Sequence, residues 1–272
     1  MKVISLGVGV QSTALYYMSS MGGLPRADVA IFADTGAEKT ATKEYYDYLI
    51  NWQKENNGIS IYRANYKDLM ADLKKQTNSS GNRFAPIPAF SANGGMLRRQ
   101  CTSEYKITQV DKMIKEILGL SKNARFPKCE IWYGITLDEI RRVSIPVQKW
   151  KINVYPLVGY KTTHTGSCEK ISDMVMRRGD LLSWYENHHL PIPVRSSCVF
   201  CPFQSDKNWL HLKRNYPDDF QDAIDVDALI RDSSKRGIKE KIYVHRSMKP
   251  LSEAEFDENQ KEFDECSGTC ML

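Results

Sequence analysis

The chain has 272 residues, of which 42% are hydrophobic and 26% charged, and its formal net charge at pH 7 is +5. This composition is ordinary for a globular protein, the length suits one large α/β domain or a core with a smaller appendage, and the mild positive charge fits an anionic partner or a solvated basic surface. No apolar run approaches the ~20 residues of a membrane span and the N-terminus lacks a signal-peptide pattern, which excludes a membrane partner and predicts a cytoplasmic protein.

The first predicted elements are a strand and a helix joined by glycines. The run KVISL has the apolar, β-branched character of a buried parallel strand. Gly7 and Gly9 interrupt it, Ser12 and Thr13 follow, and TALYYM continues with helical spacing. This order is typical of a phosphate-binding loop, where backbone N–H groups at a helix N-terminus face an anion. It is neither G-x-G-x-x-G nor a Walker A loop, and a turn that binds nothing stays the alternative.

The next part of the chain alternates strand and helix twice. ADVAIFADTG and SIYRAN read as strands, and ATKEYYDYLINWQKE and YKDLMADLKK read as helices. Such alternation predicts a parallel sheet with helices on both faces, where ligands bind beyond the carboxyl ends of the strands.

Residues 76–95 have no periodicity and are rich in Ser, Asn, Gly and Pro. We interpret them as a flap near the nucleotide pocket, with a plain insertion as the alternative. A polar segment from Met96 leads into a predicted helix with Thr102 or Ser103 as its N-cap. Strands are predicted near EIWYGIT and INVYPLV, and a helix around CEKISDMVMRRG. From about Pro191 the sequence turns to cysteines, aromatics and helices. We divide the chain into a nucleotide-binding domain, 1–160, and a helical C-terminal region, 161–272.

Cysteines carry the strongest local signal. Cys198 and Cys201 form a C-x-x-C pair in SSCVFCPF, which can hold a metal ion, take two corners of a cluster or act as a redox dithiol. Cys101 and Cys168 complete a candidate four-thiolate set, whereas Cys129 reads as a buried small hydrophobe. Arg98, Arg99 and Lys106 surround Cys101, and such a basic setting suits phosphates and lowers a thiol pKa.

Two further motifs offer catalytic groups. The tail ECSGTC carries Cys266 and Cys270, which read as a redox pair, a metal half-site or two incidental thiols. YGITLDEIRRV places Asp138 and Glu139 after a strand, where a carboxylate pair could hold Mg²⁺. Arg141 and Arg142 follow and could grip phosphates, although a solvated helix start explains the same residues.

The motifs together resemble the PP-loop superfamily of adenine-nucleotide α-hydrolases, and within it the phosphoadenosine-phosphosulfate (PAPS) reductase-like branch of bacteria and phages. The matching stretches are SLGVGVQST, ADTGAE, RRQCTSEYK, GITLDEIRR, SSCVFCPF and ECSGTC, so the resemblance runs from Ser5 to Cys270. Val8 departs from it, since this branch has Gly there.

The resemblance implies an adenine-nucleotide-α-hydrolase-like α/β fold of the HUP type, a parallel sheet with flanking helices plus a small helical C-terminal region that bears cysteines. It implies that the PP-loop holds phosphates or sulfate, that the backbone near Ala33, with Asp34, lies beside the adenine and ribose, and that a [4Fe–4S] cluster sits on Cys101, Cys168, Cys198 and Cys201. The implied nucleotide-binding residues are Ser5, Gly7, Gly9, Gln11, Ser12, Thr13, Ala33, Asp34 and Gly134.

Three functions stay open at this point. The first is an ATP-dependent enzyme that adenylates a small-molecule or nucleic-acid acceptor for sulfur insertion, with a sulfur donor or reductant protein as partner. In it Asp138 or Glu139 holds Mg²⁺, and the groups expected to position phosphates are Arg98, Arg99, Lys106, Arg141 and Arg142. The second is a reductase of adenylyl sulfate or its 3′-phosphorylated form, with Cys266 as the nucleophile; it ranks lower because the chain has no Cys-Cys pair and no E-C-G-x-H tail. The third is a non-catalytic nucleotide-sensing subunit with a structural zinc. The oligomeric state is open.

Overall fold

The computed structural model describes residues 1–75, 87–97, 100–234 and 238–259. Arg98, Arg99, Cys266 and Cys270 lie outside these ranges, as does the first part of the predicted flap, so the predictions for them stay untested.

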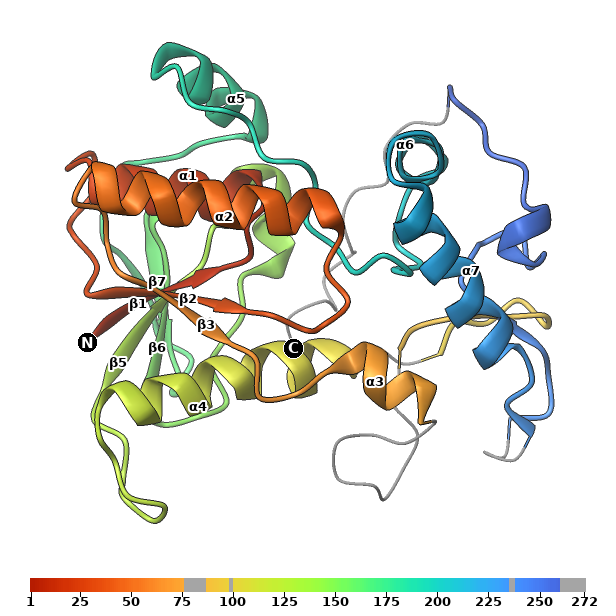
Figure 1. Ribbon diagram of the computed structural model, residues 1–272. Helices are drawn as coiled ribbons and strands as arrows, with labels where there is room; N and C mark the ends of the chain where they lie inside the picture. The colour runs from red at the N-terminus through yellow and green to blue at the C-terminus, as the bar shows by residue number, and fades with distance from the viewer. Residues whose placement is uncertain (76–86, 98–99, 235–237, 260–272) are drawn as a thin grey trace.

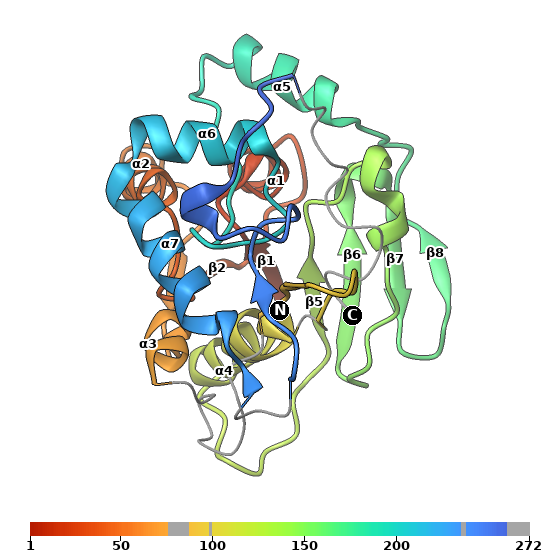
Figure 2. The ribbon, with the colours of Figure 1, turned by 90° about the vertical axis from the view of Figure 1, so that its right-hand side faces the viewer.

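The centre of the molecule is a seven-stranded sheet in the order β3-β2-β1-β5-β6-β7-β8. The first five strands in this order run parallel, and β7 and β8 are antiparallel additions at one edge. Figure 2 shows the strands side by side, with β8 at the far edge. The strands are β1 Lys2–Leu6, β2 Val29–Ala33, β3 Ile61–Ala64, β5 Cys129–Trp132, β6 Lys151–Tyr155, β7 Tyr160–Thr163 and β8 Cys168–Lys170.

Helices cover both faces of the sheet, as the alternating pattern predicts (Figure 1). The central strands are apolar and buried on both faces, which is what a parallel sheet between helical layers requires. One face packs under α1 Val10–Ser20 and α2 Thr40–Glu55, with α5 Arg178–Asn187 against α1, and the other face packs on α4 Thr108–Ile117.

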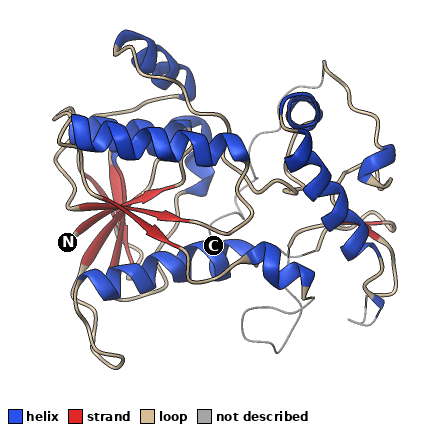
Figure 3. Ribbon diagram, viewed as in Figure 1, coloured by secondary structure: helices blue, strands red, loops and turns tan. Residues whose placement is uncertain are grey.

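A second group of helices lies beside the sheet (Figure 3) and packs around a second hydrophobic cluster. It is built on α3 Leu69–Lys74, α6 Asp206–Asn215, α7 Pro217–Arg231 and the small sheet of β4 Phe90–Ser91 with β9 Ile242–Tyr243. The predicted domain boundary at residue 160 does not separate the main sheet from the second cluster. The main sheet continues past it to Lys170, and the second cluster includes Leu69 and Ile87 from before it.

The prediction of a helix around 168–179 is wrong for all but its last two residues. Cys168–Lys170 pairs with β7 in a hairpin whose turn holds Gly166 at φ +86°, and the helix α5 begins only at Arg178. Ile171 and Val175 are 44% and 55% exposed, whereas Met174 and Met176 pack against the core. Burial that alternates over 174–176 fits extended chain and not a helix.

The predicted N-cap at Thr102 or Ser103 is also wrong. Thr102 has helical dihedrals and no capping hydrogen bond, and Ser103–Ile107 forms a π-helical turn that runs into α4. The fold is therefore α/β, with a mostly parallel sheet flanked by helices and a second, mainly helical cluster. No helix in the described ranges has the length and apolar character to cross a membrane.

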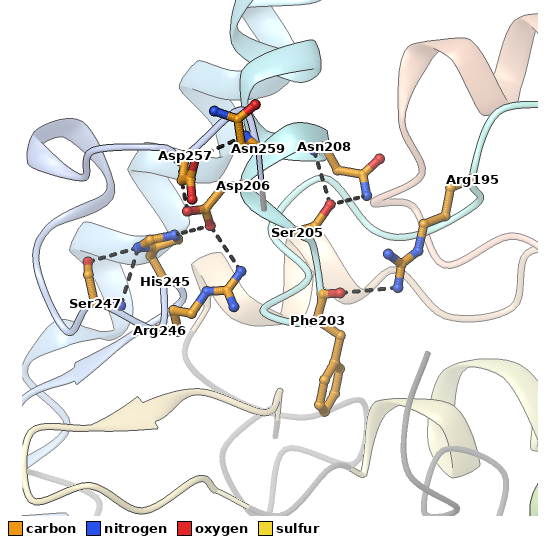
Figure 4. A network of polar contacts seen from close by, with 10 residues as sticks. All are labelled: Arg195, Phe203, Ser205, Asp206, Asn208, His245, Arg246, Ser247, Asp257 and Asn259. Carbon is orange, nitrogen blue, oxygen red and sulfur yellow. Dashed lines mark hydrogen bonds and ion pairs between the residues drawn. The ribbon is translucent and has the colours of Figure 1, made fainter. Parts of the chain in front are cut away.

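A buried polar network holds the segment after β9 onto α6 (Figure 4). Asp206 Oδ1 lies 3.1 Å from His245 Nε2 and 3.0 Å from Arg246 Nη2, and its Oδ2 accepts from the Asp257 N–H. Ser247 donates its backbone N–H to His245 Nδ1, so the proton of a neutral ring lies on Nε2 and points at Asp206.

This network makes stability fall on acidification. Burial lowers the pKa of His245, so below pH ~6.5 the unfolded chain binds a proton that the folded ring resists. Burial acts to raise the pKa of Asp206, but the hydrogen bonds from Asp257, His245 and Arg246 outweigh it and lower that pKa, so its stabilisation is lost only in stronger acid. Urea unfolding at pH 7, 6 and 5 should show a falling free energy for the natural chain and a flatter profile for His245→Gln. Exposed His211→Gln is the control; equal slopes for all three would contradict the assignment.

Candidate functional site

The loop after β1 is closed by one hydroxyl. Ser12 Oγ accepts a hydrogen bond from the Gly7 N–H at 3.1 Å and donates to the Gly9 carbonyl at 3.3 Å. Gly9 is the N-cap of α1 and offers no side chain to cap it. The first-turn N–H groups of a helix have no acceptor within the helix, so here they are available to an anion.

Val8 adopts the left-handed backbone that the loop requires. Its φ is +55°, a conformation that glycine adopts freely and that costs a β-branched residue roughly 1–3 kcal/mol. Its side chain is fully buried in the core cluster of α1 and β1, which offsets this cost. The loop therefore keeps the backbone of a glycine loop although the sequence places Val there.

Two distant segments press against this loop. A Cβ on Gly134 would lie 2.6 Å from the Gln11 carbonyl carbon and 2.6 Å from the Ser12 nitrogen. A Cβ on Gly9 would lie 2.8 Å from Ser196 Oγ, in the segment that carries the C-x-x-C pair. Glycine is required at residue 134 because backbone meets backbone there.

These three segments enclose a cavity of about 530 Å³ at the carboxyl ends of β1, β2 and β5. Its volume and position match those of ligand sites in parallel α/β sheets. Of the predicted nucleotide-binding set, seven residues line it: Ser5, Gly7, Gly9, Gln11, Ser12, Ala33 and Gly134.

The other two predicted nucleotide contacts do not line the cavity. Thr13 is fully buried in the first turn of α1. Asp34 is 5% exposed, accepts from the Gly36 N–H and forms an ion pair with Arg63 from β3. Its carboxylate orders the turn after β2 and is not offered to a ligand in this structure.

Three of the four cysteines predicted to bind the cluster line the cavity. Cys101, Cys198 and Cys201 all line it. Cys198 Sγ lies 3.6 Å from Thr35 Oγ1, which donates in turn to Glu38 Oε1 at 3.0 Å. Burial, with the nearby Glu38 carboxylate, raises the pKa of the Cys198 thiol, so without a cation to bind it this sulfur stays protonated.

Cys168 does not join the other three. It is exposed on β8, five strands away from β2, and at ~4.8 Å per strand this separates it from the turn after β2 by roughly 24 Å (Figure 2). The predicted four-cysteine set is therefore not assembled. Within the described ranges, no three His, Cys, Asp or Glu side chains lie close enough together to hold a metal ion.

The 3₁₀ turn Leu137–Arg142 carries both predicted pairs, the acidic and the basic. One member of each pair lines the cavity and the other does not. Glu139 lines the cavity with Arg142, and the two side chains form an ion pair at 2.6 Å. Asp138 points away, is partly exposed and accepts from the Arg178 N–H at 2.6 Å, where α5 begins. Arg141 is exposed and outside the cavity. A carboxylate pair for Mg²⁺ is thus not presented to the cavity.

Lys106 is a cation of the cavity, and its Nζ lies 3.9 Å from Glu38 Oε1. Arg195 also lines the cavity and donates to the Phe203 carbonyl at 3.1 Å, which orders the turn around the C-x-x-C pair (Figure 4). Burial lowers the pKa of Lys39, at the start of α2, to about 8, although the nearby Cys201 acts in the opposite direction.

Sequence reasoning missed three residues that line the cavity: Thr35, Arg195 and Ser196. Their signal was adjacency, since Thr35 lies in the DTG turn and Arg195 and Ser196 directly precede the C-x-x-C pair. Searches of protein-family models and of curated proteins find no match to this chain, so the site itself carries the functional argument.

Proposed function

We propose that the protein is a PP-loop enzyme of the HUP type that binds ATP in the cavity and adenylates an acceptor for sulfur transfer. One observation carries the proposal: the glycine loop and the C-x-x-C segment form two walls of one cavity, with Ser196 packed on Gly9. A phosphate held by the first and a sulfur held by the second would therefore lie in the same space.

The loop supplies the anion site. First-turn N–H groups of α1 and the positive end of its dipole would hold the phosphates, and Lys106 would neutralise part of their charge. Donors fixed in this way stabilise the charge that develops when a bond to the α-phosphorus forms. Of the predicted carboxylate pair, Glu139 is the member that lines the cavity, and it would take part in binding Mg²⁺ with the nucleotide.

In the adenylation step an acceptor oxygen forms a bond to the α-phosphorus while the bond to the bridging oxygen breaks, and pyrophosphate leaves with that electron pair. A sulfur nucleophile then bonds to the activated carbon, and AMP departs with the acceptor oxygen. Sulfur enters without net oxidation when the donor supplies it at the sulfide level.

An iron–sulfur cluster or, alternatively, zinc would be held by the three cysteines that line the cavity, Cys101, Cys198 and Cys201. Their sulfurs would have to draw together around it, because they do not form a ligand set as they stand. Such a cluster, when bound, would keep sulfur available beside the nucleotide. A metal would also reverse the effect of burial on the Cys198 thiol, since metal coordination favours the thiolate.

Anaerobic purification with iron, sulfide and zinc analysis tests this assignment. Cys198→Ser should lower iron and sulfide content, and Cys168→Ser, on the distant edge strand, should leave both unchanged. If both variants lost iron and sulfide equally, Cys168 would be a fourth ligand after all. Zinc without sulfide would support a structural zinc site and the nucleotide-sensing function.

The activity is tested with α-labelled ATP and the purified chain. Release of AMP and pyrophosphate, stimulated by an acceptor, supports the proposal. Sulfite release from adenylyl sulfate, lost in Cys266→Ser, would favour the reductase instead. Nucleotide binding without turnover of either nucleotide would favour the sensing subunit.

A further inference from the structure

Gln11 is held at its backbone and at its side chain by two segments that are distant in the sequence. Gly134, which follows β5, packs so closely on the first turn of α1 that a Cβ there would lie 2.6 Å from the Gln11 carbonyl carbon. Arg178, the first residue of α5, directs its Nη1 at Gln11 Oε1, 3.5 Å away. Gln11 itself lines the cavity next to the glycine loop. Both supports therefore act on a residue that a ligand in the cavity would meet.

The Arg178 guanidinium decides which end of the Gln11 amide faces it. Arginine carries only hydrogen-bond donors, so the amide atom turned toward Nη1 is the carbonyl oxygen. The amide nitrogen, Nε2, is on the other branch of the same planar group and points in another direction. Nε2 has no hydrogen-bond partner among the residues that the structure describes, and it is not sealed from solvent. An accessible pair of N–H donors is thus left in the cavity wall.

The start of α5 is tied to the turn that follows β5, and this sets where the Arg178 side chain begins. The Arg178 N–H donates to Asp138 Oδ2 at 2.6 Å. In the same turn the Leu137 N–H donates to the Met176 carbonyl at 2.9 Å, two residues before α5 begins. Asp138, predicted from the sequence as a ligand of Mg²⁺, therefore serves as an anchor for the residue that contacts Gln11.

The orientation of the amide matters because phosphate oxygens accept hydrogen bonds. The nitrogen end of the Gln11 amide can donate to a phosphate, whereas the oxygen end would face it acceptor to acceptor. A hydrogen bond to an ionised group is roughly twice as strong as one between neutral groups. The contact with the guanidinium also polarises the amide, which strengthens its N–H groups as donors.

We propose that Arg178 is a positioning residue for the nucleotide: by binding Gln11 Oε1 it turns Gln11 Nε2 toward the cavity, where Nε2 donates to a phosphate oxygen. This inference rests on the proposed function, because it takes the ligand at the glycine loop to be a nucleotide phosphate. Arg178 does not itself line the cavity, so it acts through Gln11 and not on the nucleotide.

A double-mutant cycle tests this coupling, with titration calorimetry of α,β-methylene-ATP as the measurement. Gln11→Ala removes the donor and should weaken binding about tenfold, and Arg178→Met, which removes the guanidinium, should weaken it about fivefold. The double variant should lose about tenfold, no more than Gln11→Ala alone, because no amide is left to orient. Losses that multiply to about fiftyfold would mean that Arg178 acts independently of Gln11, and would overturn the proposal.

Nuclear magnetic resonance follows the amide itself. The side-chain proton–nitrogen signals of Gln11, identified by their absence in Gln11→Ala, should shift when the analogue binds to the natural chain. They should shift less in Arg178→Met at saturating analogue, because the amide is no longer held in one orientation. Equal shifts in both chains would make Arg178 a merely structural residue and overturn the proposal. Signals that stay in place in the natural chain would overturn it even if Arg178→Met failed to fold.

The matched control is Arg177→Met. Arg177 carries the same charge as its neighbour, but its side chain is 66% exposed and pairs with Asp138. Its loss should change the affinity by less than about twofold. Equal weakening by Arg177→Met would show that positive charge near the cavity explains the effect, and would overturn the proposal. A natural chain that binds no ATP analogue would instead overturn the proposed function.

Discussion

Gly134→Ala should lower the affinity for an ATP analogue by about 100-fold. The added Cβ would lie 2.6 Å from two backbone atoms of the first turn of α1, in Gln11 and Ser12, and backbone cannot turn aside as a side chain can. The loop would have to move on the order of 1 Å, and a displacement of that size at a binding constellation costs roughly 100-fold. Titration calorimetry with α,β-methylene-ATP measures the loss, and urea unfolding shows that the variant is folded.

Gly179→Ala is the matched control, since a Cβ there meets nothing within 4 Å. It lies in the first turn of α5, where Ala is well tolerated. The control should bind the analogue as the natural chain does. Unchanged affinity in Gly134→Ala, with the fold intact, would show that the loop after β1 is not the phosphate site.

Asp227→Ala should lower the free energy of unfolding by about 3–5 kcal/mol. Asp227, in α7, is fully buried, accepts from the Val244 N–H at 2.8 Å and the Leu251 N–H at 3.0 Å, and forms an ion pair with Arg231. Removing the carboxylate leaves two buried N–H groups without an acceptor and the Arg231 guanidinium without its ion-pair partner. Removing one partner of a buried pair is strongly destabilising because the other stays buried and uncompensated. Equilibrium unfolding in urea measures the change.

Two variants make this result specific. Asp227→Asn keeps one oxygen acceptor and should lose less, while Asp225→Ala, exposed on the same helix, should stay within about 0.5 kcal/mol of the natural chain. Equal losses at Asp225 and Asp227 would point to helix propensity rather than to the network. Because β9 pairs with β4, close to cavity residues Ile87 and Pro88, Asp227→Ala should also weaken nucleotide binding.

Local pattern was sufficient for the first half of the main sheet. The alternation of apolar strands and amphipathic helices up to residue 75 predicted β1 to β3 and α1 to α3 in order, because each element buries its face independently of distant sequence. The glycine loop followed from the same local signals, and Val8 keeps the left-handed backbone of such a loop.

Prediction from the local sequence pattern failed for a short, polar segment. The edge strand at Cys168–Lys170 is exposed throughout, so it has no apolar alternation to distinguish it from a helix. Its partner strand and the turn at Gly166 decide its conformation, and neither is visible in a local window.

The sequence by itself determined the order of the central elements, the glycine loop after β1 and the C-x-x-C pair of this protein. Only the tertiary structure decided which of these groups share one cavity: Cys101 lines it with Cys198 and Cys201, but Cys168 does not. It also decided that Gly134 packs on the first turn of α1 and Ser196 on Gly9. The physical reason is that propensity and periodicity act over a few residues, whereas contacts between distant residues depend on strand order and register. These are settled by the packing of the whole core.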